Sequence, residues 1–469
     1  MPALEPHRGI GRDLVRLPRE RRVNLFSLLW LIFFTTCGGA FGLEPLVGAV
    51  GPALALLLIV ITPFVWSLPT ALMTAELTAL IPEEGGYYVW IRKAFGPFWA
   101  VQQACWIMTT SVVWLAMFPV LFVSYLTYFF PAIAAVPDSA RHPWNAFICW
   151  ALAGMVLACG ALLNLRGARE VGRSANVSAY FVLGAFLVLL LVWLKRSPAH
   201  EPIFDVLRND HGLSKKGALL LGFSYITFNT SGWDNPSTYA GEVNEPQRNY
   251  PRALIWAVFV LVLCYVFPVT AGVTVTTSPA AWSADAGWPA VATVMGGRWL
   301  GSLLALAGMV STFGMCSAQL LYVSRLPLML ASDGWLPGMF AKVSPAAGAP
   351  RGSILTFAVI AGVLAALSFG SLAIIQCVLY AACLTFEFLA LLVLRLRYPN
   401  SDRSFKVPGG WFGLAYVCLA PFAFAAVLLY ATLRDWRNFP GQLVVVAAVV
   451  AGGLVLYLIR RKTADTQAR

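Results

Sequence analysis

A polar stretch in the middle of an apolar segment limits what this chain can fold into. The apolar segment runs from about residue 217 to 243, and the stretch Asn229-Thr-Ser-Gly-Trp-Asp-Asn-Pro236 interrupts it. The apolar segment from 25 to about 49 has a similar interruption, Thr36-Cys-Gly-Gly-Ala-Phe-Gly42. Broken backbone has unpaired N–H and C=O groups, so a lipid-facing helix cannot contain such a stretch. Two interrupted helices that line a cavity can, and they are typical of transporters built from inverted repeats.

The composition places the whole chain in a membrane. Of its residues, 59% are hydrophobic and only 12% are charged, and the mean hydropathy is +0.74. A soluble chain would carry about a quarter charged residues. We therefore predict a single all-α polytopic domain. Twelve spans are expected, at about 25–49 (interrupted), 52–81, 98–130, 144–164, 171–194, 217–243 (interrupted), 252–276, 299–324, 353–369, 372–394, 411–433 and 441–459, with a short interfacial helix at 87–95.

The distribution of basic residues predicts the orientation of these spans. With the N-terminus inside, 24 of the 33 lysines and arginines fall in inner segments. Such an excess marks the cytoplasmic side. We expect cytoplasmic tails at 1–24 and 461–469 around a transporter domain at 25–460. The net charge of +12 is thus a topology signal with secondary attraction to anionic membrane lipid, and it does not indicate nucleic-acid binding.

The remaining reactive residue types argue against an enzyme or a metal site. The nine cysteines form no CxxC pair and lie mostly in apolar runs, and the four histidines all lie in polar segments. Neither HExxH nor GxSxG occurs. We therefore expect no catalytic residues, no bound metal and no cofactor.

The predicted topology brings the two interruptions together near the membrane midplane. Span one runs outward and span six runs inward, so their half-helices meet antiparallel. The halves that start after Gly42 and at Pro236 present free N–H groups, which favour an anion. The other two halves end in free carbonyls, which favour an ammonium group or a metal cation. This arrangement matches the two ends of a zwitterion.

Several motifs resemble the amino acid–polyamine–organocation superfamily. They are Gly38-Gly-Ala-Phe-Gly-Leu-Glu44, Ala75-Glu76, Glu84-Gly-Gly-Tyr-Tyr-Val-Trp90, Trp233-Asp-Asn-Pro-Ser-Thr-Tyr-Ala-Gly-Glu-Val243 and Ser324-Arg-Leu-Pro-Leu-Met-Leu-Ala-Ser-Asp-Gly-Trp-Leu-Pro337. The Trp-Asp-Asn break and Phe386-Glu-Phe-Leu-Ala-Leu-Leu-Val-Leu-Arg395 are most similar to its polyamine-uptake group. The resemblance implies a permease with a LeuT-type five-plus-five inverted repeat, with repeat one at about 25–194, repeat two at about 217–396 and two extra helices at about 411–459. A bacterial inner membrane is the expected location.

Two departures from that group leave the substrate and the coupling ion open. The group carries an Asp about five residues before the proline of span three, where this chain has Trp114 before Pro119. Each charge of a polyamine needs a carboxylate in a low-dielectric site, so this loss weakens the polyamine interpretation. Some superfamily members replace a sodium ion with a span-five lysine, and the interior of this fifth span has none. The alternative to a cationic amine carrier is a neutral or general amino acid permease or exchanger.

The candidate site residues follow from the breaks and from carboxylates at membrane depth. The predicted substrate-binding residues are Gly38, Gly39, Ala40, Phe41, Gly42, Glu44, Ser231, Gly232, Trp233, Asp234, Asn235 and Glu387. The predicted gating or coupling residues are Trp233, Glu76 and Glu387.

Each of these residues also has a structural interpretation. Asp234 precedes Asn235-Pro236, so it could simply cap a helix. Trp233 could be core packing, and Glu44 could face an outer vestibule without binding a ligand. Two further carboxylates could form ion pairs, Glu387 with Arg395 two turns away and Glu76 at the inner interface.

Charge favours a positively charged substrate and a proton as the coupling ion. Intramembrane carboxylates are functional by default, and Asp234 is the main candidate to bind an amine. A buried carboxylate without a partner favours its neutral, protonated form, whereas a bound ammonium favours the ionised form. Amine binding would then release the proton, which describes exchange at one site. Symport needs a second proton site, for which Glu387 is the candidate.

Overall fold

The computed structural model describes residues 22–133, 143–196, 222–223, 225–283, 287–366, 369–434 and 440–467. Within these residues the regular elements are helices, and an isolated parallel bridge joins Val23 to Val243. The predicted all-α class is therefore what the described part of the chain adopts.

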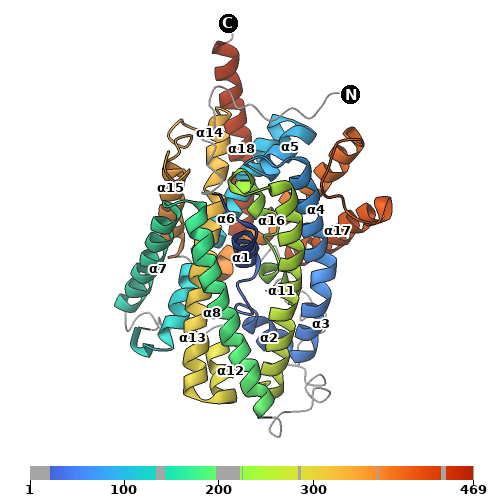
Figure 1. Ribbon diagram of the computed structural model, residues 1–469. Coiled ribbons are helices and arrows are strands. Elements are labelled where there is room, and N and C mark those ends of the chain that lie inside the picture. The colour runs from blue at the N-terminus through green and yellow to red at the C-terminus, as the bar shows by residue number, and fades with distance from the viewer. Residues whose placement is uncertain are drawn as a thin grey trace.

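The helices follow one another along the chain (Figure 1). They are α1 (Leu25–Thr36), α2 (Glu44–Val50), α3 (Pro52–Thr62), the π-helical turn η2 (Pro63–Ser67), α4 (Leu68–Leu80), α5 (Tyr87–Phe95), α6 (Pro97–Thr127), the 3-10 turn η3 (Pro131–Ile133), α7 (Pro143–Asn164), α8 (Ala168–Lys195), the 3-10 helix η5 (Asn235–Glu242), α11 (Pro246–Val275), α12 (Gly287–Gly296), α13 (Arg298–Val323), α14 (Arg325–Ser332), α15 (Arg351–Leu364), α16 (Phe369–Arg397), α17 (Gly410–Arg434) and α18 (Pro440–Gln467).

Seven helices among the described residues are long and apolar enough to cross a membrane. They cover Pro52–Leu80, Pro97–Thr127, Trp144–Asn164, Ala168–Lys195, Pro246–Val275, Arg298–Ser332 and Leu379–Arg397. Four shorter apolar helices are Leu25–Thr36, Arg351–Leu364, Gly410–Ala423 and Ala447–Arg460. All of these overlap predicted spans, while the count of twelve stays a prediction. The short helix α12, between the seventh and eighth predicted spans, was not predicted.

The long helices run along a common axis and enclose the interrupted ones (Figure 1). α13 packs against α6 and α8, and α1 packs against α8 and α11. In Figure 1, α5, α14 and the C-terminal end of α18 lie at one end of the bundle, and α2 and α12 lie at the other. We call these the basic end and the opposite end, because the former carries Arg92, Arg325 and Arg460.

Both predicted interruptions are present. Residues 37–43 between α1 and α2 are not helical. In the second interrupted segment, residues 225–229 are helical, 230–234 are not, and η5 continues from 235. These intervals nearly coincide with the predicted 38–42 and 230–235. The sequence therefore places the breaks to within a residue or two.

Candidate functional site

The two breaks lie against each other. The side-chain amide of Asn229 donates a hydrogen bond of 2.9 Å to the carbonyl of Gly42. Gly232 has φ +99°, and a Cβ added there would lie 2.7 Å from the carbonyl oxygen of Thr35. A larger residue at 232 would be strained and would push the breaks apart. The predicted adjacency of the breaks is thus what the structure has.

Asp234 lies in the second break and is fully buried. Its Oδ1 accepts a hydrogen bond of 2.5 Å from the phenol of Tyr380, a residue of α16. Its side chain makes no capping hydrogen bond to η5, and no described residue donates to Oδ2. The geometry therefore favours the binding interpretation of Asp234 over the capping one.

Tyr380 is a site residue that the sequence interpretation missed. Its hydroxyl also accepts a hydrogen bond of 2.8 Å from the backbone N–H of Gly232, so it ties the break to α16. Glu387 follows seven residues later, and residues seven apart lie on one face of a helix. The sequence could have indicated Tyr380 through its seven-residue spacing from the intramembrane carboxylate of Glu387.

The other residues of the second break are mostly engaged locally. The Ser231 hydroxyl donates to the carbonyl of Thr227 at 2.7 Å, and the Trp233 indole N–H donates to the carbonyl of Thr230 at 2.8 Å. Trp233 is fully buried. The amide oxygen of Asn235 has no hydrogen-bond partner among the described residues. Asn235 and Asp234 are thus the polar side chains of this break that keep free acceptor atoms.

The first break is held by two neighbouring helices. The hydroxyl of Ser311 donates to the carbonyl of Gly38 at 2.5 Å, and the indole N–H of Trp288 donates to the carbonyl of Ala40 at 2.8 Å. A Cβ added to Gly39 would lie 3.0 Å from Val182. Phe41 packs against aromatic rings of α6 and α8. The free carbonyls expected here are therefore partly occupied by α13 and α12.

The contacts of Glu44 give it a structural role. It is buried, and its Oε2 accepts from the backbone N–H of Gly42 at 2.5 Å. Its Oε1 accepts from the phenol of Tyr125 at 2.9 Å and from the N–H of Trp288 at 3.4 Å. Because both carboxylate oxygens have donors, Glu44 secures the start of α2 against α6 and α12.

Glu387 is fully buried and does not pair with Arg395, so that ion-pair interpretation is wrong. Its Oε1 accepts from the side-chain amide of Gln103, on α6, at 2.9 Å. No described residue donates to its Oε2. Arg395 lies two turns further along α16 and pairs with Glu76 instead, because α4 and the loop after α16 converge there.

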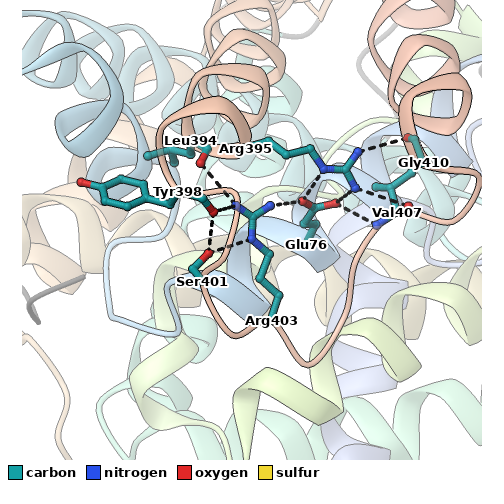
Figure 2. A network of polar contacts seen from close by, with 8 residues as sticks. All are labelled: Glu76, Leu394, Arg395, Tyr398, Ser401, Arg403, Val407 and Gly410. Atoms are coloured by element: carbon teal, nitrogen blue, oxygen red, sulfur yellow. Dashed lines mark hydrogen bonds and ion pairs between the residues drawn. The ribbon is translucent and has the colours of Figure 1, made fainter. Parts of the chain in front are cut away.

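Glu76 is the centre of a buried ion-pair network at the basic end (Figure 2). Its oxygens lie 2.9 Å from Nη2 of Arg395 and 2.5 Å from Nη1 of Arg403, and the N–H of Val407 donates to it at 2.8 Å. Nε of Arg395 also donates to Glu76, Nε of Arg403 donates to the hydroxyl of Ser401, and other donors of the two arginines reach backbone carbonyls, which include those of Tyr398 and Gly410. Glu76 therefore joins α4 to α16 and the following loop, which agrees with the ion-pair interpretation.

A second buried charge cluster covers the basic-end side of the break. Arg325 donates to Glu242 through Nε at 2.7 Å and Nη2 at 3.2 Å, and Arg325 is fully buried. The partly buried Glu84 contacts Gly241, and the N–H of Gly85 donates to the carbonyl of Thr238 at 2.9 Å. We call Glu84, Glu242 and Arg325 the closing cluster, since they fasten η5 to α14 and to the loop between α4 and α5.

The centre of the molecule contains several buried hydrogen-bond acceptors that have no donor among the described residues. Asp234 is bonded to Tyr380 of α16, and Glu387 lies seven residues further along the same helix. The buried guanidinium groups of Arg325 and Arg395 are engaged by Glu242 and Glu76. Among the described residues, no three histidines, cysteines or carboxylates gather into a metal-binding group. Chemically, this centre suits a ligand that supplies N–H donors and positive charge.

Comparisons with known proteins agree on one family. A sequence model described as amino acid permease matches residues 23–450. The chain is 35% identical to the polyamine transporter PUT1 of Oryza sativa subsp. japonica over 439 residues, which are 93% of this chain and 78% of the relative. It is 32% identical to the polyamine transporter RMV1 of Arabidopsis thaliana over 96% of this chain and 86% of the relative. It is also 25% identical to a methylthioribose transporter of Bacillus subtilis over 94% of each.

Proposed function

This chain belongs to the amino acid permease family, and from that premise we propose that it is a secondary active transporter of cationic amines, with polyamines favoured. The observation that carries the proposal is Asp234, a fully buried carboxylate in the second break that keeps one oxygen without a donor among the described residues. A buried carboxylate needs a cationic or donor partner, and a transported ammonium provides one.

The family match settles the broader class. The chain is an integral membrane protein and a transporter, and the relatives are named transporters, so the prediction that it is not an enzyme is confirmed. The predicted resemblance to the superfamily and its polyamine-uptake group is confirmed as well. A neutral or general amino acid permease or exchanger remains the second candidate, because the methylthioribose transporter shows that relatives differ in cargo.

The proposed architecture is a LeuT-type inverted repeat of twelve spans, with both termini cytoplasmic in a bacterial inner membrane. In its support, the two breaks are antiparallel neighbours near the middle of the bundle. The excess of lysine and arginine in the segments that would face inside supports the orientation. Alternating access would then rock one helix group about the breaks.

For coupling, we propose a proton. When the site is empty, Asp234 holds a proton, and the bound ammonium replaces it. This scheme needs no span-five lysine. It gives exchange of amine for proton at one site, and symport would place a second proton at Glu387.

The direct test is a competition uptake panel in proteoliposomes. Purified protein would be reconstituted and supplied with labelled spermidine, with putrescine, spermidine, lysine, arginine and leucine as competitors. Putrescine and spermidine should compete strongly, and an imposed proton gradient should change the rate of spermidine uptake. Uptake of labelled leucine but of neither polyamine would instead identify the protein as a neutral or general amino acid permease or exchanger.

Trp233→Ala is expected to lose most transport while the protein still inserts and folds. The indole fills the second break and donates to Thr230, so its removal leaves the break unable to close fully around a substrate. Uptake rates per correctly folded protein would be measured, with folding checked by size-exclusion profile. Wild-type rates in a well-expressed variant would show that Trp233 is ordinary core packing.

Glu84→Gln is expected to remove a pH dependence of inward opening. Glu84 lies in the loop between α4 and α5, outside the spanning helices, where burial and the neighbouring Glu242 raise its pKa from 4.5 to about 7, while Arg325 opposes the shift. The closed cluster therefore binds a proton that the open, hydrated side chain releases. This contribution to closure is complete below pH 4.5 and is lost as the pH rises through about 7.

The measurement is counterflow of labelled substrate as the pH on the inner side is raised from about 6 to about 8. Counterflow in the wild type should rise with an inflection near 7, whereas Glu84→Gln, which is neutral throughout, should lack it. Glu170→Gln on the exposed Glu170–Arg173 pair is the matched control. An unchanged inflection in Glu84→Gln would assign the proton to another group.

A further inference from the structure

Two fully buried carboxylates, rather than one, face the same polar layer. Asp234 is bonded to Tyr380, and Glu387 follows Tyr380 by seven residues on α16. Seven residues of α-helix rise about 10 Å and bring the chain back to the same face. The two carboxylates are therefore offset along the bundle axis, with Glu387 toward the basic end.

Two hydrogen-bond acceptors next to each other, on Glu387 and Gln103, have no donor among the described residues. Gln103 uses its amide N–H on Oε1 of Glu387, and no described residue donates to Oε2 of Glu387 or to the amide oxygen of Gln103. Both side chains are at least 99% buried. Buried acceptors without donors are costly, and an ammonium group brings three N–H donors together with the charge that Glu387 needs.

The wall between the two carboxylates suits a hydrocarbon chain. Cys383 lies on the same face of α16 between Tyr380 and Glu387, and its thiol is 4.0 Å from the carbonyl of Gln103. Two charged ends and a less polar middle are the pattern of a linear polyamine.

We propose that Glu387 and Gln103 form a second ammonium subsite, so that a linear substrate with two or more ammonium groups spans from Asp234 to Glu387. This inference rests on the proposed amine transport. It supplies a second carboxylate for a polyvalent amine. Glu387 thereby becomes the residue that separates polyamines from monoamines.

The test measures binding of amines of graded length to the purified full-length protein. The probes are butylamine, putrescine, cadaverine and spermidine, with affinity read from calorimetric titration at fixed pH. Glu387→Gln keeps the size of the side chain and removes its charge. It should weaken spermidine binding by at least about tenfold, since hydrogen bonds to charged groups are strong, and change butylamine binding by less than about twofold.

A conservative variant distinguishes a residue that sets the preferred length of the amine from a residue with only a structural role. Glu387→Asp keeps the charge but withdraws it by one methylene, so it should retain binding and shift the preference toward longer amines. Glu170→Gln, which alters the exposed ion pair with Arg173, should leave the affinities for all of the amines unchanged. Correct folding of each variant is checked by its unfolding temperature without ligand.

The outcomes separate the inference from the proposed function. If Glu387→Gln loses affinity for butylamine and spermidine equally, or loses affinity for neither, the second subsite is overturned. Unchanged affinities together with loss of proton-gradient-driven uptake would make Glu387 a proton site only, and would also overturn it. If the wild type binds no amine while it binds leucine, the proposed function itself fails and the second subsite fails with it.

Discussion

Asp234→Asn is expected to abolish transport of cationic amines while the protein folds normally. Asn retains the shape and an oxygen for the phenol of Tyr380, so the break should keep its geometry. It removes only the charge. Loss of one partner from a buried charge pair costs about 2–5 kcal/mol, so spermidine uptake at low concentration should fall by about 30-fold or more.

The measurement is the initial rate of labelled spermidine and putrescine uptake in proteoliposomes that contain equal amounts of folded protein. Any flux of a neutral substrate such as leucine could survive, because a neutral substrate does not use the charge. Glu170→Gln, which removes an exposed carboxylate, should behave as the wild type. Full uptake of both polyamines by Asp234→Asn would end the hypothesis that this carboxylate binds the amine.

Glu76→Gln is expected to destabilise the protein severely. Figure 2 shows two arginines directed at the Glu76 carboxylate, which also accepts from the backbone N–H of Val407. The substitution leaves the guanidinium groups of Arg395 and Arg403 close together and without a counter-charge. Loss of one partner of a buried ion pair costs about 3–5 kcal/mol.

The expected readouts are a marked fall in unfolding temperature in detergent and a low yield of monodisperse protein. Removal of one of the two arginines in the same background, as in Glu76→Gln with Arg403→Gln, should restore part of the loss, because it relieves the excess positive charge. Glu170→Gln again serves as the exposed control. If Glu76→Gln unfolds like the wild type yet transports poorly, Glu76 is a coupling residue and its network has no large structural role.

Four of the buried carboxylates fall into two pairs with different consequences. Glu242 pairs with one arginine and Glu76 with two, and both carboxylates join helices at the basic end. Asp234 and Glu387 have only neutral donors, from Tyr380 and Gln103, and each keeps an oxygen without a donor among the described residues. We therefore expect substitutions in the first pair to affect folding and closure, and substitutions in the second to affect substrate binding.

The amino-acid sequence alone determined the class of fold and the position of both breaks. Each rests on a property that is local along the chain: a span requires about 20 apolar residues, and the backbone of a lipid-facing span must pair within its own helix. A polar stretch with Gly232 and Pro236 at membrane depth violates the second requirement wherever the helix packs. For that reason the predicted breaks agree closely with the intervals 37–43 and 230–234.

The tertiary structure alone decided what each buried carboxylate contacts. Glu387 lies two turns from Arg395 on one helix, yet its partner is Gln103, 284 residues away, and Arg395 bonds Glu76, 319 residues away. The sequence left it open whether Glu44 binds a ligand, and the packing of α6 and α12 placed two donors, from Tyr125 and Trp288, on its Oε1, while the backbone N–H of Gly42 donates to its Oε2. Partners of this kind depend on how each helix is rotated and shifted against its neighbours. Hydrophobic length does not encode that rotation, because every face of a membrane-embedded helix is apolar enough to be buried.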